Sequence, residues 1–323
     1  MRFIDRDEVA RRLTYGVAIP MVREAMIAFS KGVTKQLLRS MMPLGEGRML
    51  GVMPGAMGAR AAFGAKLISI FPENFGSGLL SRGLSSHQGV VVLFDAETGA
   101  PVCVVHAGEI TAIRTAAASA VATDVLARKD ARRLALLGYG EQAETHARAM
   151  AKVRAVESVV VWGRSVERAQ AFAERMEAEL GVEVRAVESV REAVAEADVV
   201  CTLTSAAEPI LMGEWVRPGT HVNVVGSSYA GPAEVDGELV RRSRFVVDSR
   251  EGVLAQGAEF LRAKAAGLVE DEHIVGEIGQ VLAGDVVGRR SAEEITVYKS
   301  LGHVAQDLAC AWTLYAEDER VEE

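Results

Sequence analysis

Two glycines close together follow an apolar run in the middle of the chain. The run at residues 134–137 ends at Gly138, Gly140 follows, and an amphipathic stretch then begins. Glycine permits a tight turn and close approach of backbone N–H groups, and a helix N-terminus attracts phosphate. The spacing alone is a weak signal, but its place after a buried strand predicts binding of a dinucleotide pyrophosphate. The predicted contacts are Gly138, Gly140, Glu141, Gln142 and Ala143.

The end of the second strand of this region should select between two cofactors. An acidic residue there would bind the ribose hydroxyls of NAD. This chain has Gly163, Arg164 and Ser165 instead, with Arg168 one helical turn further on. Arginine and serine suit a 2′-phosphate, so Arg164, Ser165 and Arg168 predict a preference for NADP(H), with NAD(H) as the alternative cofactor. The competing interpretation is that Arg164 is a solvated turn residue.

Four basic side chains lie in apolar surroundings before the glycine loop. They are Arg39, Lys66, His87 and Arg114. A lysine in a strand, or an arginine in a helix of small residues, needs an anion or a place at the surface. Arginine binds carboxylates bidentately, and lysine is a point donor with a tunable pKa. Each residue alone is more simply structural, and the hypothesis of a carboxylate-binding catalytic site depends on their occurring together.

Charge and cysteine content exclude several classes of protein. The 323 residues carry a net charge of −8 and the isoelectric point is about 5.5, which argues against nucleic acid or an anionic membrane as a partner. No signal core follows Met1, and no apolar run is long enough to span a bilayer. Cys103, Cys201 and Cys310 lack metal-ligand spacing and favour buried, reduced thiols. We therefore expect a cytoplasmic protein without a metal site.

The length of the chain predicts two domains. Residues 7–31 have helical spacing, and residues 37–105 form short strand-like runs between glycines, which predicts an antiparallel sheet. A helix is expected at 110–127, with Thr111 as a cap. Residues 251–283 are predicted to be helical, and an amphipathic helix ends the chain.

Strands and helices alternate regularly from Arg132 onward. The predicted strands are at 132–137, 157–162, 183–187, 198–204, 220–226 and 244–248. Nearly continuous apolar runs such as 198–204 are typical of parallel strands covered on both faces. The fold class is therefore α/β. A Rossmann-type doubly wound NAD(P)-binding domain is predicted at 125–298, and an α+β domain at 1–124 that includes the C-terminal helix 299–323.

Nine short motifs together resemble those of the ornithine cyclodeaminase/μ-crystallin family, from near the N-terminus to about residue 315. The motifs are Leu50-Gly-Val-Met-Pro, Ala65-Lys-Leu, Ser86-His-Gln, Ile110-Thr-Ala-Ile-Arg-Thr-Ala-Ala, Gly138-Tyr-Gly-Glu-Gln-Ala, Glu208-Pro-Ile-Leu, Gly213-Glu-Trp-Val-Arg-Pro-Gly-Thr-His-Val-Asn, Val247-Asp-Ser-Arg and Tyr298-Lys-Ser-Leu-Gly. They are far more specific than the glycine loop alone.

This resemblance implies a homodimer of two-domain subunits, with the N-terminal sheet forming the dimer contact and the substrate pocket. It implies that Arg39 and Arg114 hold the substrate carboxylate. Lys66 would lie beside the reacting amino or imino carbon, and His87 near the pocket. The remaining predicted cofactor contacts are Thr204, Val225 and Lys299.

Departures from the family pattern select among its reactions. Ser228 stands where ornithine cyclodeaminases and archaeal-type alanine dehydrogenases have Asp, and Arg164 stands where an acidic residue would bind NAD. Both are similar to the ketimine reductase branch and predict NAD(P)H-dependent reduction of small cyclic α-imino acids, Δ1-pyrroline-2-carboxylate or Δ1-piperideine-2-carboxylate. Gln256 begins a second departure, which leaves the side-chain pocket open. The alternatives are ornithine cyclodeaminase, alanine or another amino-acid dehydrogenase, and an NADPH-keeping binding protein with little catalysis.

Overall fold

The fold is that of a computed structural model, which describes residues 1–58, 62–74 and 85–322. Its contacts divide the chain into two compact units, Met1–Arg114 with His303–Glu323, and Thr115–Gly302. We call them the N-terminal unit and the central unit. The domain boundaries predicted from the sequence lie at residues 124 and 299, and the limits of independently folding domains remain a prediction.

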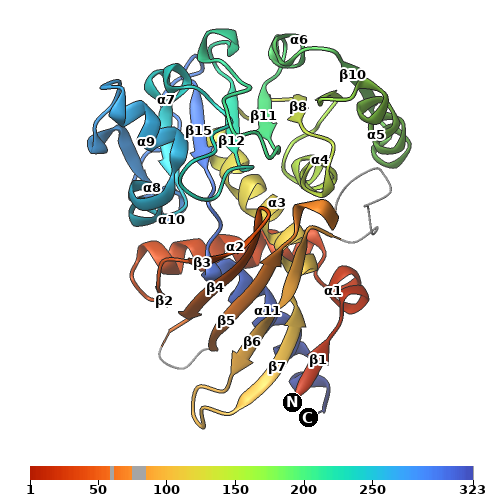
Figure 1. The fold of residues 1–323 in the computed structure, drawn as a ribbon, viewed down its shortest axis with the longest axis vertical. Coiled ribbons are helices and arrows are strands. Elements are labelled where there is room, and N and C mark those ends of the chain that lie inside the picture. The colour runs from red at the N-terminus through yellow and green to blue at the C-terminus, as the bar shows by residue number, and fades with distance from the viewer. Residues whose placement is uncertain (59–61, 75–84, 323) are drawn as a thin grey trace. The chain divides into compact units, whose positions relative to one another are not determined.

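The N-terminal unit is built on a mixed sheet (Figure 1). Among its described residues, seven strands pair in the order β1-β7-β6-β5-β4-β2, and β3 pairs with β4. The strands are β1 (Arg2–Ile4), β2 (Lys35–Gln36), β3 (Ser40–Gly45), β4 (Arg48–Ala56), β5 (Phe63–Ile70), β6 (His87–Phe94) and β7 (Pro101–His106). All pairs are antiparallel except β1 with β7. The structure thus confirms the antiparallel sheet predicted at 37–105 and adds one parallel edge strand.

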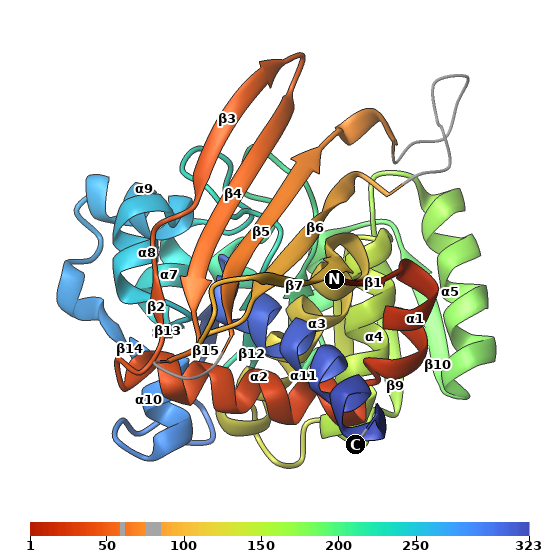
Figure 2. The same cartoon turned by 90° about the horizontal axis from the view of Figure 1, so that it is seen from below.

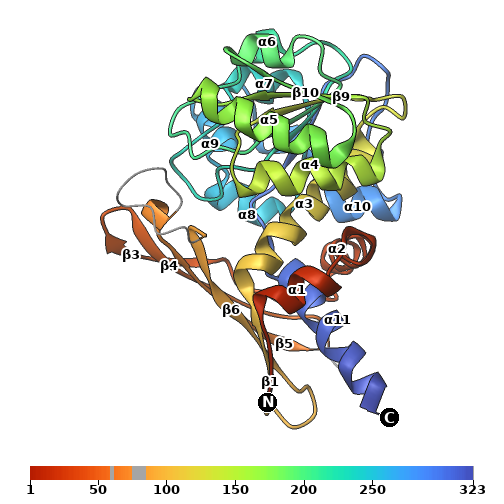
Figure 3. The same ribbon diagram turned by 90° about the vertical axis from the view of Figure 1, so that its right-hand side faces the viewer.

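Helices cover one face of this sheet. Side chains alternate between the two faces along each strand, and the register places Met53, Lys66, Val91 and Val105 side by side in one buried row. The helix α11 (Val304–Glu322) packs against β4, β5 and β6, and against α2 (Tyr15–Ser30) (Figures 2 and 3). Lys66 therefore projects from an apolar row toward the helical layer.

Two helices of the N-terminal unit, and the helix in which the boundary at Arg114 falls, follow the predicted pattern with one correction. The helix α1 (Arg6–Arg12) and α2 lie within the stretch predicted to be helical. The helix α3 (Ala107–Leu126) begins directly after β7, earlier than predicted. Thr111 is therefore not its cap, because it lies inside the first turns and its hydroxyl donates to the carbonyl of Ala107.

The central unit is a doubly wound parallel sheet. Residues 115–302, all of which the structure describes, include an eight-stranded sheet in the order β10-β9-β8-β11-β12-β15-β13-β14 (Figure 1). Its strands are β8 (Arg133–Leu137), β9 (Ser158–Trp162), β10 (Glu183–Val187), β11 (Val199–Thr202), β12 (His221–Val224), β13 (Arg244–Val247), β14 (Ile274–Glu277) and β15 (Thr296–Lys299). Every residue of β11, β12 and β15 is buried, so both faces are covered. The predicted α/β class and the six predicted strands are confirmed.

The helices of the central unit agree with the predicted alternation except in one region, where the prediction was wrong. They are α4 (Glu141–Val153), α5 (Val166–Leu180), α6 (Val190–Val194), α7 (Gly237–Arg242), α8 (Arg250–Gln256), α9 (Ala258–Ala265) and α10 (Ile278–Ala283). The segment predicted to be helical at 251–283 also contains β14, which pairs with β13. A segment as short as Ile274–Glu277 fits a helix or a strand equally well, and only tertiary pairing decides between them.

Two features bear on the expected environment of the protein. No helix in the described part of the chain combines the length and the apolar character needed to cross a bilayer. Cys103, Cys201 and Cys310 are free and buried, as predicted. Burial raises the pKa of Cys201 and Cys310 to about 12, so these thiols are unreactive near neutral pH.

Candidate active site

The loop between β8 and α4 has the geometry that a phosphate site needs. Gly138 adopts φ +132°, and a Cβ there would lie 2.7 Å from the carbonyl oxygen of Leu203. Gly140 is the N-cap of α4 and no side chain caps the helix, so the first turn presents N–H groups to a ligand. The amide oxygen of Gln142 is buried without a partner among the described residues, and Ala143 is fully buried. A dinucleotide pyrophosphate fits this loop.

Tyr139 connects the glycine loop to the end of β9. A Cβ on Gly163 would lie 2.1 Å from a ring carbon of Tyr139, so only glycine admits the ring there. The guanidinium carbon of Arg168 lies 4.9 Å from the centroid of the same ring. The structure therefore brings the predicted pyrophosphate loop and Arg168 together around one aromatic side chain.

The other two residues predicted at the end of β9 lie beside this aromatic contact. Arg164 is exposed. The hydroxyl of Ser165 caps α5 by accepting from the backbone N–H of Arg168 at 3.2 Å and donates to Glu167 at 2.8 Å. Ser165 thus has a structural role at this end of the strand, and the side chains of Arg164 and Arg168 are both exposed there.

A buried carboxylate accepts hydrogen bonds from the carboxyl ends of both β11 and β12. Glu234 accepts hydrogen bonds from the hydroxyl of Thr202 at 2.6 Å, the N–H and hydroxyl of Thr204 at 2.6 and 2.7 Å, and the N–H of Gly226 at 2.6 Å. Burial raises the pKa of Glu234, although these donors oppose the rise. Thr204 and Val225, two predicted cofactor contacts, are thereby fixed at the carboxyl ends of neighbouring parallel strands, where α/β proteins bind ligands.

Lys299 lies in a second buried network under the same edge. Its amine donates to the carbonyl and hydroxyl of Ser227, both at 2.7 Å, and lies 2.7 Å from Glu259. Burial works to raise the pKa of Glu259, but Lys299 and Ser227 outweigh it and the pKa lies below its usual value. A direct contact between the amine of Lys299 and a cofactor would break these bonds, so its contribution is to support the loop at Ser227.

The N-terminal unit contains a compact group of buried charges on β5, α3 and α11. The amine of Lys66 lies 3.0 Å, and Nε of Arg114 lies 3.1 Å, from the same oxygen of Asp307. Nη1 of Arg114 donates to the amide oxygen of Gln306 at 2.9 Å. Lys66 is 2% exposed and Asp307 is 0% exposed. A buried ion pair of this kind stays charged only because each partner compensates the other.

The electrostatics place His87 and Arg39 near this group. Burial lowers the pKa of Lys66 to about 8; Asp307 opposes this fall, and Arg114 and Arg39 add to it. Burial lowers the pKa of His87 to about 4, and Lys66, Arg114 and Arg39 contribute. His87 is therefore neutral at neutral pH, and its Nδ1 lies 2.9 Å from the hydroxyl of Ser86. The structure brings together the four basic residues that the sequence singled out.

Three polar residues of this region were missed by the sequence analysis. Asp307 and Gln306 lie in the first turn of α11, and His303 precedes it. The ring of His303 packs 3.9 Å from that of Phe29, and burial lowers its pKa to about 3. An acidic residue in a terminal amphipathic helix is usually solvated, so only the need for an anion beside Lys66 and Arg114 could have indicated Asp307.

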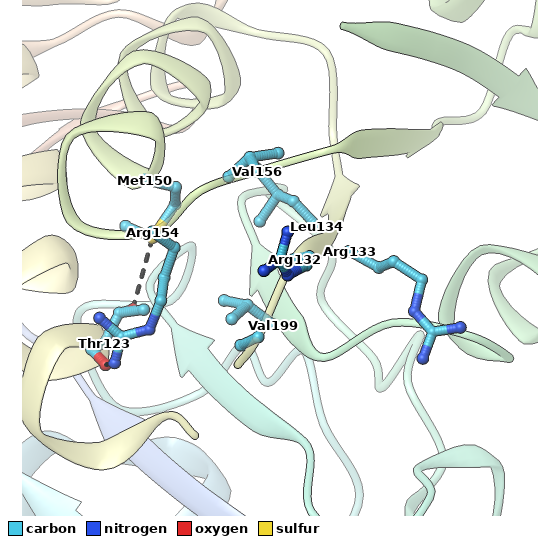
Figure 4. Close-up of a pocket in the computed structure, with 9 residues that line it drawn as sticks. Thr123, Arg132, Arg133, Leu134, Met150, Arg154, Val156 and Val199 are labelled. Carbon is cyan, nitrogen blue, oxygen red and sulfur yellow. Dashed lines mark hydrogen bonds between the residues drawn. The ribbon is translucent and has the colours of Figure 1, made fainter. Parts of the chain in front are cut away.

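The described residues form no metal-binding cluster, and a small cavity in the central unit lies away from the glycine loop. No group of three or more potential ligand side chains among the described residues could hold a metal ion. A cavity of about 10 Å³ lies at the amino ends of β8 and β11, beside Thr123 and Arg154 (Figure 4). It has room for about one water molecule and lies at the opposite end of the strands from the glycine loop.

A dinucleotide-binding α/β unit, together with a buried lysine and arginine on a second unit, defines a nicotinamide-dependent oxidoreductase of amino or imino acids. Comparison with known proteins narrows this class. The profile of the Ornithine cyclodeaminase/mu-crystallin family matches residues 2–322, and the chain belongs to that family. The resemblance seen in the motifs is thus confirmed.

Individual relatives match along nearly their whole length. The chain is 37% identical over 318 residues to the ketimine reductase mu-crystallin of Mus musculus, covering 97% of this chain and 96% of that protein. It is 33% identical over 317 residues to the Delta(1)-pyrroline-2-carboxylate reductase of Bacillus cereus, covering 98% and 96%. The Thermococcus litoralis Delta(1)-pyrroline-2-carboxylate reductase, solved with NADH and L-proline, has a TM-score of 0.93, 34% identity, and coverage of 99% of this chain and 98% of that one.

Proposed function

We propose that this protein is an NAD(P)H-dependent reductase of small cyclic α-imino acids, with Δ1-pyrroline-2-carboxylate and Δ1-piperideine-2-carboxylate as candidate substrates. The observation that carries the proposal is the buried contact of Lys66 and Arg114 with Asp307. It provides one cation for a carboxylate and one donor for a nitrogen. The relatives named as imine reductases support the same reaction.

The residues of the N-terminal unit would bind and protonate the substrate. Arg114, with one edge held by Asp307 and Gln306, retains N–H groups for a bidentate bond to the substrate carboxylate. Arg39 adds a second positive charge. Lys66 donates a hydrogen bond, and then a proton, to the imine nitrogen. When bound, the dihydronicotinamide supplies the hydride to the imine carbon.

The test is cofactor oxidation by the purified protein with each imino acid, measured with NADPH and with NADH. Rapid oxidation that depends on the imino acid supports the proposal. No oxidation with either cofactor removes it. The protein would then be assayed for ornithine cyclisation and alanine oxidation, and binding of a carboxylate ligand without turnover would indicate a binding protein.

We propose that NADPH is the preferred cofactor and that Arg164 is the reason. The supporting observation is an exposed arginine at the end of β9 where NAD-binding proteins have an acidic residue. The related Thermococcus litoralis enzyme was solved with NADH, so the preference needs a direct test. A charge-assisted bond to phosphate contributes about 1.5–3 kcal/mol, so Arg164→Ala should lower kcat/KM for NADPH about 10–100-fold. The value for NADH should stay unchanged.

The control for this substitution is Arg191→Ala, at an exposed arginine of α6 in the same unit. It should leave both cofactors unaffected. If Arg164→Ala lowers kcat/KM equally for NADPH and NADH, the arginine does not bind the 2′-phosphate.

We further propose that the protein is a homodimer joined through the outer face of the N-terminal sheet. This face is apolar and includes Phe63 at 37% and Leu67 at 38% exposure. The register places Val52, Leu67 and Val90 in one row, which ends at His106 on β7, and Pro54, Ala65, Val92 and Val104 in the next. A contiguous apolar face of this kind is typical of a protein interface.

The buried free cysteines and acidic charge support a cytoplasmic location.

A charge on this face should separate the subunits. We expect Leu67→Glu to give a monomer in light scattering where the wild-type protein gives a dimer, because an unpaired carboxylate would be buried in the interface. The control is Val287→Glu, which places the same charge on an exposed apolar residue of the central unit and should leave the dimer intact. A dimeric Leu67→Glu protein would show that another surface joins the subunits.

A further inference from the structure

Asp307 is a buried carboxylate shared by two candidate active-site cations. It lies in the first turn of α11 with no exposed surface, and one oxygen contacts both Lys66 and Arg114. Burial works to raise the pKa of Asp307, but Arg114 and Lys66 outweigh it and the pKa lies below its usual value. Asp307 is therefore ionised near neutral pH and supplies the negative charge at the centre of the cluster.

Lys66 depends on that negative charge. Three influences favour its neutral amine: burial, Arg114 and Arg39. Asp307 opposes all three, through its charge and through a direct hydrogen bond. The balance leaves the pKa of Lys66 at about 8, so the ammonium form is present at neutral pH. Without Asp307 the balance would move toward the amine.

The other titratable groups around Lys66 do not change charge in the same range. The pKa of His87 on β6 is about 4 and that of His303 before α11 is about 3, because both rings are buried among cations. Burial raises the pKa of Cys310 on α11 to about 12. Arg39 and Arg114 are the arginines that act on Lys66. Among these facing groups, Lys66 is the one that titrates between pH 6 and 10.

Asp307 also orients Arg114. It binds Nε, and its neighbour Gln306 binds Nη1. The amide of Gln306 is itself held, since it contacts the sulfur of Met26 at 3.2 Å. Two successive residues of one helix therefore hold the inner side of the guanidinium, and the remaining N–H groups keep a fixed direction.

We infer that Asp307 is a positioning residue that holds Lys66 in its ammonium form and fixes the guanidinium of Arg114 for the substrate carboxylate. This inference rests on the proposed imine reduction. In that reaction a C–H bond forms with the hydride of the reduced nicotinamide, which is oxidised. An N–H bond of the Lys66 ammonium breaks as an N–H bond forms on the substrate nitrogen. The neutral amine then regains a proton from solvent, and Asp307 remains a carboxylate throughout.

The first test measures the protonation of Lys66 directly and does not need turnover. Protein carrying lysine labelled with ¹³C at Cε is titrated by NMR, and the signal of Lys66 is assigned by its loss in Lys66→Arg. We expect a titration near pH 8 in the wild-type protein. In Asp307→Asn it should occur about one to three pH units lower, since an opposite charge at this range has that effect. An unchanged titration pH would overturn the inference.

A matched control separates this effect from general loss of stability. Asp198 is a buried carboxylate of the central unit that pairs with Arg128 and Arg217 at 2.8 and 2.6 Å. Asp198→Asn also removes the charge of a buried, paired carboxylate, but it should leave the Lys66 signal in place. Asp307→Glu keeps the charge and should restore a titration close to the wild-type value, even if packing lowers its thermal stability.

The second test is the pH profile of kcat/KM for imino-acid reduction. Above about pH 8 the wild-type value should fall as Lys66 loses its proton, and the same limb should lie at lower pH in Asp307→Asn. If kcat/KM of Asp307→Asn is lower at every pH but falls over the same pH range as in the wild-type protein, Asp307 has a merely structural role. If the wild-type protein reduces no imino acid, the proposed function fails, while the NMR titration still decides the role of Asp307.

Discussion

Lys66→Met should lower turnover with an imino acid by about 10²–10⁴-fold, the usual contribution of a general acid. Methionine has a similar length and apolar stem but neither the charge nor the proton. Asp307 would keep its contact with Arg114, so the carboxylate would not be left without a cation. The measurement is steady-state cofactor oxidation, and cofactor affinity, measured by fluorescence titration, should be unchanged because the proposed cofactor contacts lie on other elements.

The control is Lys35→Met, at an exposed lysine of β2 in the same sheet. It removes the same charge from the N-terminal unit without touching the buried cluster, and its turnover should equal that of the wild-type protein. Near-normal turnover of Lys66→Met would contradict the role given to Lys66 and, with it, the proton source of the proposed reaction.

The central unit could be predicted from sequence because its signals are local. A buried parallel strand has a nearly continuous apolar sequence, and Gly138 and Gly140 mark the turn into α4. The strand β14 was missed because its four residues, Ile274–Glu277, lie between helices and contain Gly276. Its strand character comes from pairing with β13, which is a tertiary property that periodicity does not contain.

The basic half of the candidate site was visible in the sequence, and the acidic half was not. Lys66 and Arg114 stand out because a cation among apolar residues is unusual. Asp307 lies in a terminal amphipathic helix and Glu234 lies close to Asp236 and Glu238, and in both settings a carboxylate is typical of a solvated surface. Their burial follows from contacts between residues far apart in the chain, such as Lys66 with Asp307 and Thr204 with Glu234. Spacing within one element carries no information about such pairs.

The second large effect concerns stability in acid. His146 and His221 in the central unit and His303 in the N-terminal unit have at most 1% exposure. Burial lowers their pKa values to about 4, about 3 and about 3. In the unfolded chain each would titrate near pH 6.5. Between the folded and the unfolded pKa values, the unfolded state binds more protons than the folded state. The stability that each neutral ring contributes is therefore present above pH 6.5 and is lost as the pH falls.

Each histidine should remove about 1.4 kcal/mol of unfolding free energy per pH unit below about pH 6. Three together remove about 4 kcal/mol per unit, which is large beside a total stability of about 5–15 kcal/mol. His87 in the N-terminal unit, whose pKa burial also lowers to about 4, adds to this loss, so each unit carries two such histidines if the units unfold separately. Carboxylates held below their usual pKa, such as Asp307 and Glu259, add to the loss only near pH 4.

Glu234 acts in the opposite direction, because its raised pKa makes the folded state bind the additional proton, and it offsets at most one histidine. Urea unfolding between pH 7.5 and pH 4.5 measures the dependence. His146→Gln should flatten it by about 1.4 kcal/mol per unit, since glutamine can bond to Ser119 and the carbonyl of Gln142 as the ring does but takes up no proton. A wild-type stability that is constant from pH 6.5 to pH 5 would show that these rings bind protons in the folded state.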